Sequence, residues 1–212
     1  MRLVKVNYLY LFILISFCLV YLHFLRFSSY QTQTILISDL LTNQYRLSNQ
    51  DIENKLSNYP SLTVSLIPIQ SLKARYYFNQ GEMIKAHNSL DIGLKDNPYM
   101  VYSHYLKARI YLSENRILKS LEYLRKGFAI SKNAPYLSSL YFALLSQLNL
   151  TNELVMIFPE LQESENSDIW KFYYLSLKNS VGVDIKFLKS VVNTASINLG
   201  ISEQEFIHNS EN

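Results

Sequence analysis

Cysteine, glycine, proline and charge are all scarce in this chain. Its single cysteine, Cys18, excludes a disulfide within the chain and a metal site built from several thiolates. Five glycines and five prolines in 212 residues argue against a β-rich or low-complexity chain. Lysine and arginine total 20 against 17 aspartates and glutamates, a balance without the basic stripe of a nucleic-acid binder. Hydrophobic residues make up 49%, enough for a sizeable core.

Residues that could carry chemistry do not form a known catalytic pattern. None of the four histidines, His23, His87, His104 and His208, stands at metal-ligand or triad spacing from an acid. There is no glycine-rich phosphate loop and no Gly-x-Ser-x-Gly turn. We therefore expect a protein that is not an enzyme, with no catalytic residue, no metal and no cofactor. The alternative is an enzyme whose site is assembled from distant residues.

A sequence unit of 34 residues occurs twice between Ile67 and Ala134. The tetrapeptide Leu-Lys-Ala-Arg at 72–75 recurs at 106–109. At the same offset Tyr77, Lys85, Leu90 and Gly93 recur as Tyr111, Lys119, Leu124 and Gly127. Apolar residues within each unit follow the spacing of two amphipathic helices separated by a turn. A fixed period in the mid-thirties is typical of stacked helix pairs, which bury their apolar faces against one another.

The unit resembles the tetratricopeptide repeat. That family prefers small, aromatic, large apolar and proline residues at fixed positions of the repeat. In the first unit these positions hold Ala74, Tyr77, Gly81, Ala86, Leu90, Gly93 and Pro98. In the second unit they hold Ala108, Tyr111, Asn115, Ser120, Leu124, Gly127 and Lys132. The second unit departs from the pattern because its proline comes three residues late, at Pro135. A third, decayed unit fits from Tyr136, with its second helix interrupted by Pro159.

The stretch Tyr8–Leu25 contains no aspartate, glutamate, lysine or arginine. As a helix it would be roughly 27 Å long, close to the thickness of a hydrocarbon core, so we expect an uncleaved membrane anchor. A cleaved signal peptide and a buried soluble helix are the alternatives. Arg2 and Lys5 precede the stretch and Arg26 follows it. This distribution predicts a single pass with a cytoplasmic amino end and the bulk of the chain outside.

The predicted fold is all-α, a transmembrane helix followed by an α-solenoid of tetratricopeptide-like helix pairs. Four parts are expected: a tip and anchor at 1–28, a degenerate helix pair at 29–66, the repeats at 67–162, and capping helices with a tail at 163–212. Before the repeats we expect a polar exit at 27–33, a helix at 35–45, and a helix that is capped near Ser48, runs through Leu56 and ends at 58–60. After the repeats we expect helices at 168–178 and 184–198 and a frayed tail at 201–212. Residues 61–68 have no assignment, and Trp170 is expected in a core or capping contact.

A partner-binding groove follows from the resemblance, because the first helices of such repeats line a concave face. By this resemblance, the repeat positions that line the concave face include the residues of the candidate site, which are Arg75, Phe78, Asn79, Tyr102, Tyr105 and Arg109. Arginines one repeat apart beside tyrosines suit an extended or acidic peptide. The alternative is that Arg75 and Arg109 only solvate the surface or pair with Glu82 and Glu114.

A narrower resemblance involves the segments 58–77 and 97–111. Their Tyr-Pro, Pro-Ile and Asn-Pro-Tyr are similar to the repeat tail of O-antigen ligase-family membrane proteins of Bacteroidetes-type bacteria. The resemblance implies a single-pass place in the inner membrane, with the bulk of the chain in the periplasm, near surface-polysaccharide polymerisation or ligation and without ligase activity. The predicted function is therefore a membrane-anchored scaffold for protein–protein interactions in the bacterial cell envelope, with no nucleic-acid partner. The alternatives are a structural subunit of a secretion or division complex, and a non-catalytic remnant of a ligase-like protein.

Overall fold

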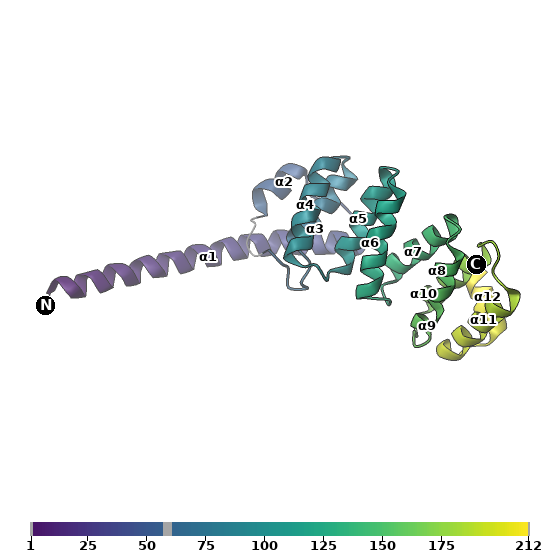
Figure 1. The fold of residues 1–212 in the computed structure, drawn as a ribbon. Coiled ribbons are helices and arrows are strands. Elements are labelled where there is room, and N and C mark those ends of the chain that lie inside the picture. Colours follow the sequence, from purple (N-terminus) through teal and green to yellow (C-terminus); the bar gives the residue numbers. More distant parts are fainter. Residues whose placement is uncertain (1, 57–60, 212) are drawn as a thin grey trace. The chain divides into compact units, whose positions relative to one another are not determined.

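The structure is a computed structural model that describes residues 2–56 and 61–211, and those residues are 76% helical with no strand (Figure 1). The helices are α1 (Arg2–Thr42), α2 (Asn49–Lys55), α3 (Ile69–Asn79), α4 (Met83–Asp96), α5 (Val101–Ser113), α6 (Ile117–Ile130), α7 (Pro135–Gln147), α8 (Thr151–Met156), α9 (Phe158–Leu161), α10 (Ser167–Lys178), α11 (Ile185–Leu199) and α12 (Glu203–Glu211). The expectation of an all-α chain is confirmed. The predicted end of the second short helix at 58–60 lies outside the described residues.

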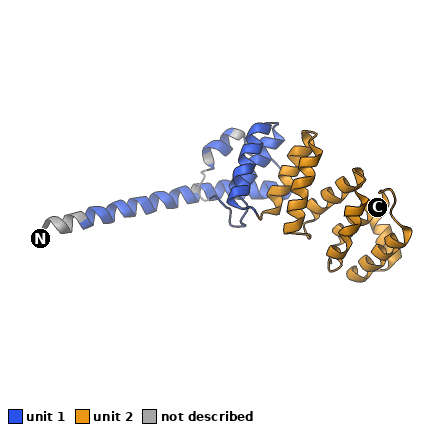
Figure 2. Ribbon diagram, viewed as in Figure 1, with its two compact units in different colours: residues 1–98 blue, residues 99–212 orange. Residues whose placement is uncertain are grey.

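The chain divides into two compact units, residues 1–98 and residues 99–212 (Figure 2). Unit 1 holds α1 to α4, and unit 2 holds α5 to α12. Each unit has its own helix pairs and its own buried apolar residues.

The first helix, α1, is long and apolar enough to cross a membrane. It runs without interruption from Arg2 to Thr42, about 60 Å at 1.5 Å per residue. The predicted polar exit at 27–33 is therefore wrong. Ser29, Thr32 and Gln33 lie on one buried helical face, and the Gln33 amide donates to the Ser29 hydroxyl at 2.9 Å. The helix continues through these polar residues, two of which bond to each other one turn apart.

The carboxyl-terminal part of α1 and α2 form the predicted helix pair before the repeats. Ser48 begins α2 with a capping box, because its hydroxyl accepts from the Asp51 amide while the Asp51 carboxylate accepts from the Ser48 amide. Leu36, Ile52 and Leu56 are buried in one cluster with residues of α3. The end of α1 is thus part of the core of unit 1.

The repeated units fold as helix hairpins with matching turns. Gly81, Asn115 and Asn149 stand 34 residues apart in the turns α3–α4, α5–α6 and α7–α8, and all three have positive φ, at 78°, 57° and 55°. Glycine and asparagine tolerate this left-handed conformation best. A third helix hairpin follows the third turn, and its second helix is broken into the short helices α8 and α9 just before Pro159.

Close helix contact explains the two glycines that recur in the second helices of the first two units. A Cβ on Gly93 would overlap the Ser71 hydroxyl and lie 3.0 Å from the Ser71 amide nitrogen. A Cβ on Gly127 would overlap the end of Leu137 and lie 3.1 Å from the His104 Cβ. The absence of a side chain at Gly93 lets α4 approach α3 of the same hairpin, and at Gly127 it leaves room both for α5 of the same hairpin and for Leu137 on α7 of the next one.

The carboxyl-terminal helices close the core of unit 2. Trp170 on α10 is buried as expected, and its indole nitrogen donates to the Ser164 carbonyl at 2.7 Å. The expected frayed tail is instead the helix α12. It is held by buried Phe206, whose ring lies 5.7 Å from that of Tyr174, and by a Lys178–Glu211 ion pair at 2.6 Å.

Residues 61–68 form a tight turn that leads into α3. The Thr63 amide donates to the Ile67 carbonyl at 2.9 Å, and the Ile69 amide donates to the Ser61 carbonyl at 2.9 Å. Leu66 takes a positive φ of 59° inside this turn. For leucine that conformation costs about 1–2 kcal/mol because its Cβ crowds the backbone.

Candidate interaction surface

In unit 1, Arg75 lies away from solvent. Only 5% of it is exposed, and its guanidinium donates to the carbonyls of Asp39 and Gln44, both at 3.1 Å, and to the Asn43 side-chain oxygen at 3.2 Å. The guanidinium carbon also stands 4.1 Å from the centre of the Tyr45 ring. The expectation that Arg75 faces an open groove is therefore wrong. Phe78 is partly buried, and Asn79 is exposed.

The contacts of Arg75 place a positive charge at the carboxyl end of α1. The last turn of α1 has no basic residue of its own. Carbonyls at the end of a helix have no partner within the helix and carry a partial negative charge. Arg75 satisfies the Asp39 carbonyl at this end and fixes the turn that follows. Its role in the structure is to hold the end of α1 against α3.

Asp39 completes this junction. Its carboxylate is fully buried and accepts from the Arg46 amide at 2.8 Å, from the Arg46 side chain and from the Tyr76 hydroxyl. We call Asp39, Arg46, Arg75 and Tyr76 the Asp39 cluster. Sequence reasoning missed it, although Asp39 is the one acidic residue of α1 and was a signal that could have been used.

Lys73 makes the matching contact with α2. Its amino group donates to the Leu56 carbonyl at 3.2 Å, just past the end of that helix. Burial lowers the pKa of the Lys73 ammonium, partly offset by the charge of Glu53. The Lys-Ala-Arg of the first unit therefore binds the ends of both preceding helices, Lys73 at α2 and Arg75 at α1.

In unit 2, the remaining candidate residues gather on α5 and beside α7. Tyr102 is buried and Tyr105 is partly buried, with ring centres 6.5 Å apart. The Tyr105 ring meets Tyr136 edge-on at 5.0 Å, and the Arg109 guanidinium carbon lies 5.7 Å from the Tyr105 centre. Arg109 and Tyr136 are exposed. We call Tyr102, Tyr105, Arg109 and Tyr136 the Tyr105 surface. The sequence interpretation did not include Tyr136.

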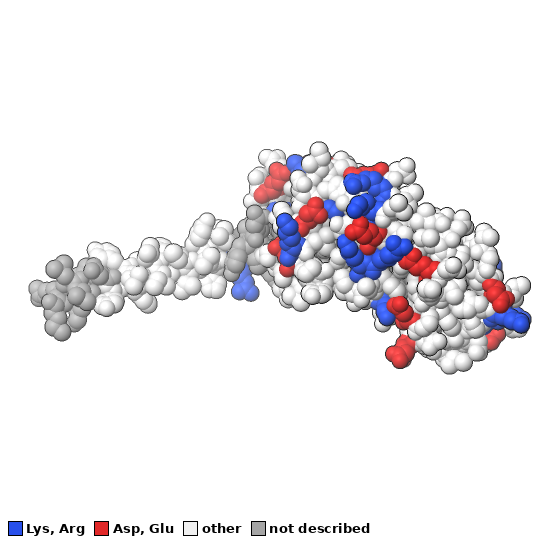
Figure 3. Space-filling model, in the orientation of Figure 1, with Lys and Arg blue, Asp and Glu red and all other residues white. Residues whose placement is uncertain are grey.

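Charges elsewhere in unit 2 are paired across helices. Arg125 on α6 donates two hydrogen bonds, of 2.6 and 2.7 Å, to the Glu153 carboxylate on α8. The Tyr141 hydroxyl donates to the same carboxylate at 2.6 Å. The hydrogen bonds from Arg125 hold the pKa of Glu153 below its ordinary value. On the face shown in Figure 3, acidic and basic atoms alternate.

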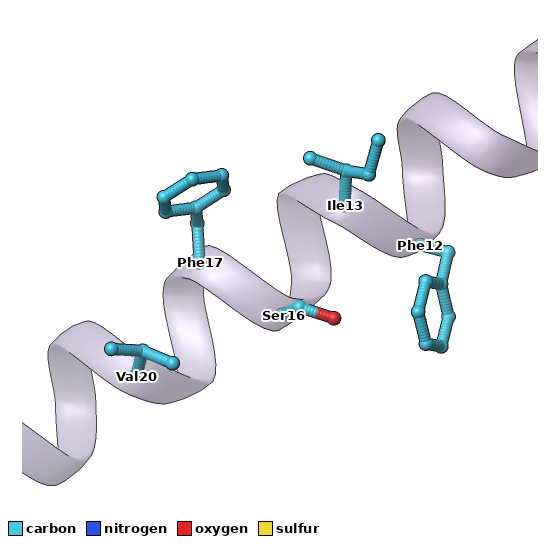
Figure 4. Close-up of a pocket in the computed structure, with 5 residues that line it drawn as sticks. All are labelled: Phe12, Ile13, Ser16, Phe17 and Val20. Atoms are coloured by element: carbon cyan, nitrogen blue, oxygen red, sulfur yellow. The ribbon is translucent and has the colours of Figure 1, made fainter.

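The apolar part of α1 exposes most of its large side chains, among them Phe12, Ile13, Phe17 and Val20. A shallow hollow lies over the short side chain of Ser16, bordered by these four residues (Figure 4). Ile13, Ser16, Phe17 and Val20 follow the i, i+3, i+4, i+7 spacing of a single helical face. The hollow is a gap between the side chains of one helix, and its apolar walls match hydrocarbon chains.

Among the described residues, no group of three or more histidine, cysteine, aspartate or glutamate side chains could hold a metal ion. Comparison of the chain with protein-family models, curated proteins and solved structures gives no match.

Proposed function

We propose that this protein is a membrane-anchored helical scaffold that binds a protein partner through the Tyr105 surface. The observation that carries the proposal is the continuity of α1. One helix exposes an apolar segment of membrane-spanning length and then becomes part of the core of unit 1. Its segment Tyr8–Leu25 is proposed to cross the inner membrane once, with the helix pairs in the periplasm. The matching turns at 81, 115 and 149 support an array of the tetratricopeptide type.

The Tyr105 surface supports recognition of an extended, acidic peptide. Arg109 is exposed beside an aromatic ring, and guanidinium groups bind carboxylates with two parallel hydrogen bonds. Tyr105 and Tyr136 offer apolar faces with polar tips, a combination enriched where proteins bind one another. Arg75 is not part of this proposal because its guanidinium is used inside unit 1.

Crosslinking in cells tests the surface. The full-length chain would be crosslinked, extracted from membranes and captured, and its partners identified by mass spectrometry. Tyr105→Ala combined with Arg109→Glu should abolish capture of the main partner, because both the aromatic face and the cation are removed. Lys189→Glu, an equal charge change at an exposed place on α11, should leave capture intact. Unchanged capture by the double variant, in protein that keeps its helical signal, would refute the surface.

The identity of the captured partner tests the place in the cell. The proposed link to surface-polysaccharide assembly is supported only by the resemblance of 58–77 and 97–111 to ligase tails. Capture of a polysaccharide polymerase, ligase or chain-length protein would support it. Capture of secretion or division proteins would keep the scaffold and remove the polysaccharide link.

A second candidate is a structural subunit whose anchor helix makes the decisive contacts. The observation that favours it is the array of exposed apolar side chains along α1. Replacing Tyr8–Leu25 by an unrelated span of equal length separates the two proposals. Retained partner capture supports the scaffold, and lost capture supports the structural subunit.

A further inference from the structure

A tyrosine hydroxyl and a cation jointly hold a carboxylate at four places among the described residues. The carboxylates are Asp39 and Glu53 in unit 1 and Glu153 and Glu211 in unit 2. The bond from the lysine or arginine, and after it the bond from the tyrosine hydroxyl, holds the pKa of Glu53, Glu153 and Glu211 below the ordinary value. The arrangement therefore favours an ionised carboxylate.

The site of Glu211 lies between α10 and α12. The Lys178 ammonium and the Tyr174 hydroxyl donate to the same Glu211 oxygen, Oε1, at 2.6 and 3.4 Å. Tyr174 and Lys178 are four residues apart on α10, so their side chains lie on one helical face. The Phe206 ring of α12 meets the Tyr174 ring edge-on, with ring centres 5.7 Å apart and an angle of 68° between the ring planes. Two rings and a cation thus surround one carboxylate.

The Tyr105 surface has the same two rings and a cation. Tyr105 and Arg109 are four residues apart on α5, as Tyr174 and Lys178 are on α10. The Tyr136 ring of α7 meets the Tyr105 ring edge-on, with centres 5.0 Å apart and an angle of 71° between the planes. The ring from the following helix, Tyr136 here and a phenylalanine in the other site, therefore has the same relation to its tyrosine.

The distance between cation and ring also matches a place where a carboxylate is bound. The Glu53 Oε1 atom accepts from the Lys85 ammonium at 3.0 Å and from the Tyr77 hydroxyl at 3.4 Å. The Lys85 nitrogen lies 5.4 Å from the centre of the Tyr77 ring. The Arg109 guanidinium carbon lies at nearly the same distance, 5.7 Å, from the centre of the Tyr105 ring.

The carboxylate is the member of the Glu211 site that α7 does not supply. The sequence of α7 contains neither aspartate nor glutamate. In the described part of the chain, the Tyr105 hydroxyl makes no hydrogen bond. A guanidinium has five N–H donors, so the exposed Arg109 can bind a carboxylate in addition to the contacts that it already makes.

We propose that the Tyr105 hydroxyl and the Arg109 guanidinium together bind one aspartate or glutamate side chain of the protein partner, as the pair on α10 binds Glu211. Tyr136 fixes the Tyr105 ring by its edge-on contact. This inference rests on the Tyr105 surface of the proposed function and specifies the partner group that this surface recognises. The surface discriminates against an amide of the same shape, because an amide brings no negative charge to the guanidinium.

Retention of peptide pools by the full-length protein in nanodiscs tests the inference. Each pool contains short synthetic peptides with blocked ends and a fixed central residue, which is glutamate, glutamine or phosphoserine. The flanking positions are random but contain no acid. The specific signal is the retention that is lost in the double variant Tyr105→Ala, Arg109→Glu. Tyr105→Phe removes only one hydroxyl, and the matched control Tyr174→Phe removes the hydroxyl of the site that Glu211 already fills.

The glutamate pool should be retained about tenfold better than the glutamine pool, because hydrogen bonds to charged groups are strong. Tyr105→Phe should reduce this preference about threefold, since one hydrogen bond is lost. Arg109→Gln should abolish the preference, and Tyr174→Phe should leave it unchanged. Thermal melts that match the parent would show that each variant is folded.

An undiminished preference in Tyr105→Phe would overturn the joint binding of a carboxylate and leave the surface of the proposed function standing. Equal retention of the glutamate and glutamine pools, stronger retention of the phosphoserine pool, or no specific retention of any pool would also overturn it. Crosslinking in cells separates this failure from failure of the proposed function. Partner capture that the double variant leaves unchanged would overturn both.

Discussion

Arg75→Ala should loosen the junction between α1 and α3, whereas Arg109→Ala should not loosen its own helix. The two arginines end the same Leu-Lys-Ala-Arg tetrapeptide, one repeat apart. Arg75 is buried with three oxygen partners, and Arg109 is exposed beside a tyrosine ring. Comparing the two variants therefore tests whether the repeat position or the local environment decides how much an arginine contributes to stability.

The expected magnitude follows from the contacts of Arg75. Three hydrogen bonds from a cation to buried or partly buried oxygens contribute about 1 kcal/mol each at the low end. The charge at the end of α1 adds roughly 0.5 kcal/mol, and the stacking on Tyr45 a similar amount. Because these contributions overlap, we expect a loss of about 3 kcal/mol. Arg109→Ala should cost less than about 1 kcal/mol, as exposed substitutions do.

Hydrogen exchange of the full-length protein in nanodiscs measures this difference segment by segment. A loss of about 3 kcal/mol should speed exchange roughly 100-fold in peptides that cover 36–48 and 69–79, where opening of the junction exposes the amides. Peptides from the apolar part of α1 should be unchanged. Arg75→Lys should give an intermediate result, because an ammonium group cannot match the fork of a guanidinium. The reasoning would be refuted if Arg75→Ala left 36–48 protected, or if Arg109→Ala speeded exchange in 101–113 equally.

Substitutions at three further positions test packing, turn geometry and charge. Gly93→Ala should destabilise unit 1 by about 1 kcal/mol net in thermal unfolding, because overpacking costs about 1–3 kcal/mol and the gain in helix propensity returns about 1. Gly81→Ala should cost about 1 kcal/mol, and Gly81→Asn clearly less, since asparagine fills the two equivalent turns; equal losses would contradict this explanation. The pKa of Glu153 is lower in the folded state than in the unfolded chain, so its stabilisation is present above the ordinary carboxylate pKa and is lost as the pH falls through the folded value. Melting of unit 2 between pH 7 and 3 should show this loss, and Glu153→Gln, which leaves Arg125 without its carboxylate, should flatten it.

The repeat in the sequence predicted the helix hairpins because its signals are local. Turn residues at 81 and 115 and the apolar periodicity around them depend on neighbours within a few residues. Pro68 likewise precedes the first residue of α3, as expected. Those features survive in the structure whatever surrounds them.

Arg75 shows where such reasoning fails. Its repeat position matches that of Arg109, but its surroundings are set by the end of α1, some thirty residues earlier in the chain. Asp39 could have signalled this, since a single carboxylate in an apolar helix requires donors. The continuous helix through 27–33 was missed for a related reason. The polar residues of this stretch suggested an exit from the helix, yet Ser29, Thr32 and Gln33 share one buried face.

The tail was misjudged because its composition is polar. Three positions of α12 attach it to α10: Phe206 through a ring contact, Glu211 through an ion pair, and Asn209, whose carbonyl accepts from the Lys171 amino group. Such a short attachment leaves almost no periodic signal in the sequence.

In the proposed membrane-anchored state, the unbroken α1 lets the thickness of the bilayer change the orientation of unit 1. A helix longer than the hydrocarbon core tilts in a thin membrane and stands upright in a thick one, at a cost of fractions of a kcal/mol per Å of mismatch. With no linker between the membrane segment and the Asp39 cluster, that tilt passes undiminished into the first helix pair. A change of about 20° in tilt, within the common range for such helices, would swing a point 15 Å along the helix by roughly 5 Å. In that proposed state, the lipid composition of the membrane acts on unit 1 through the tilt of α1.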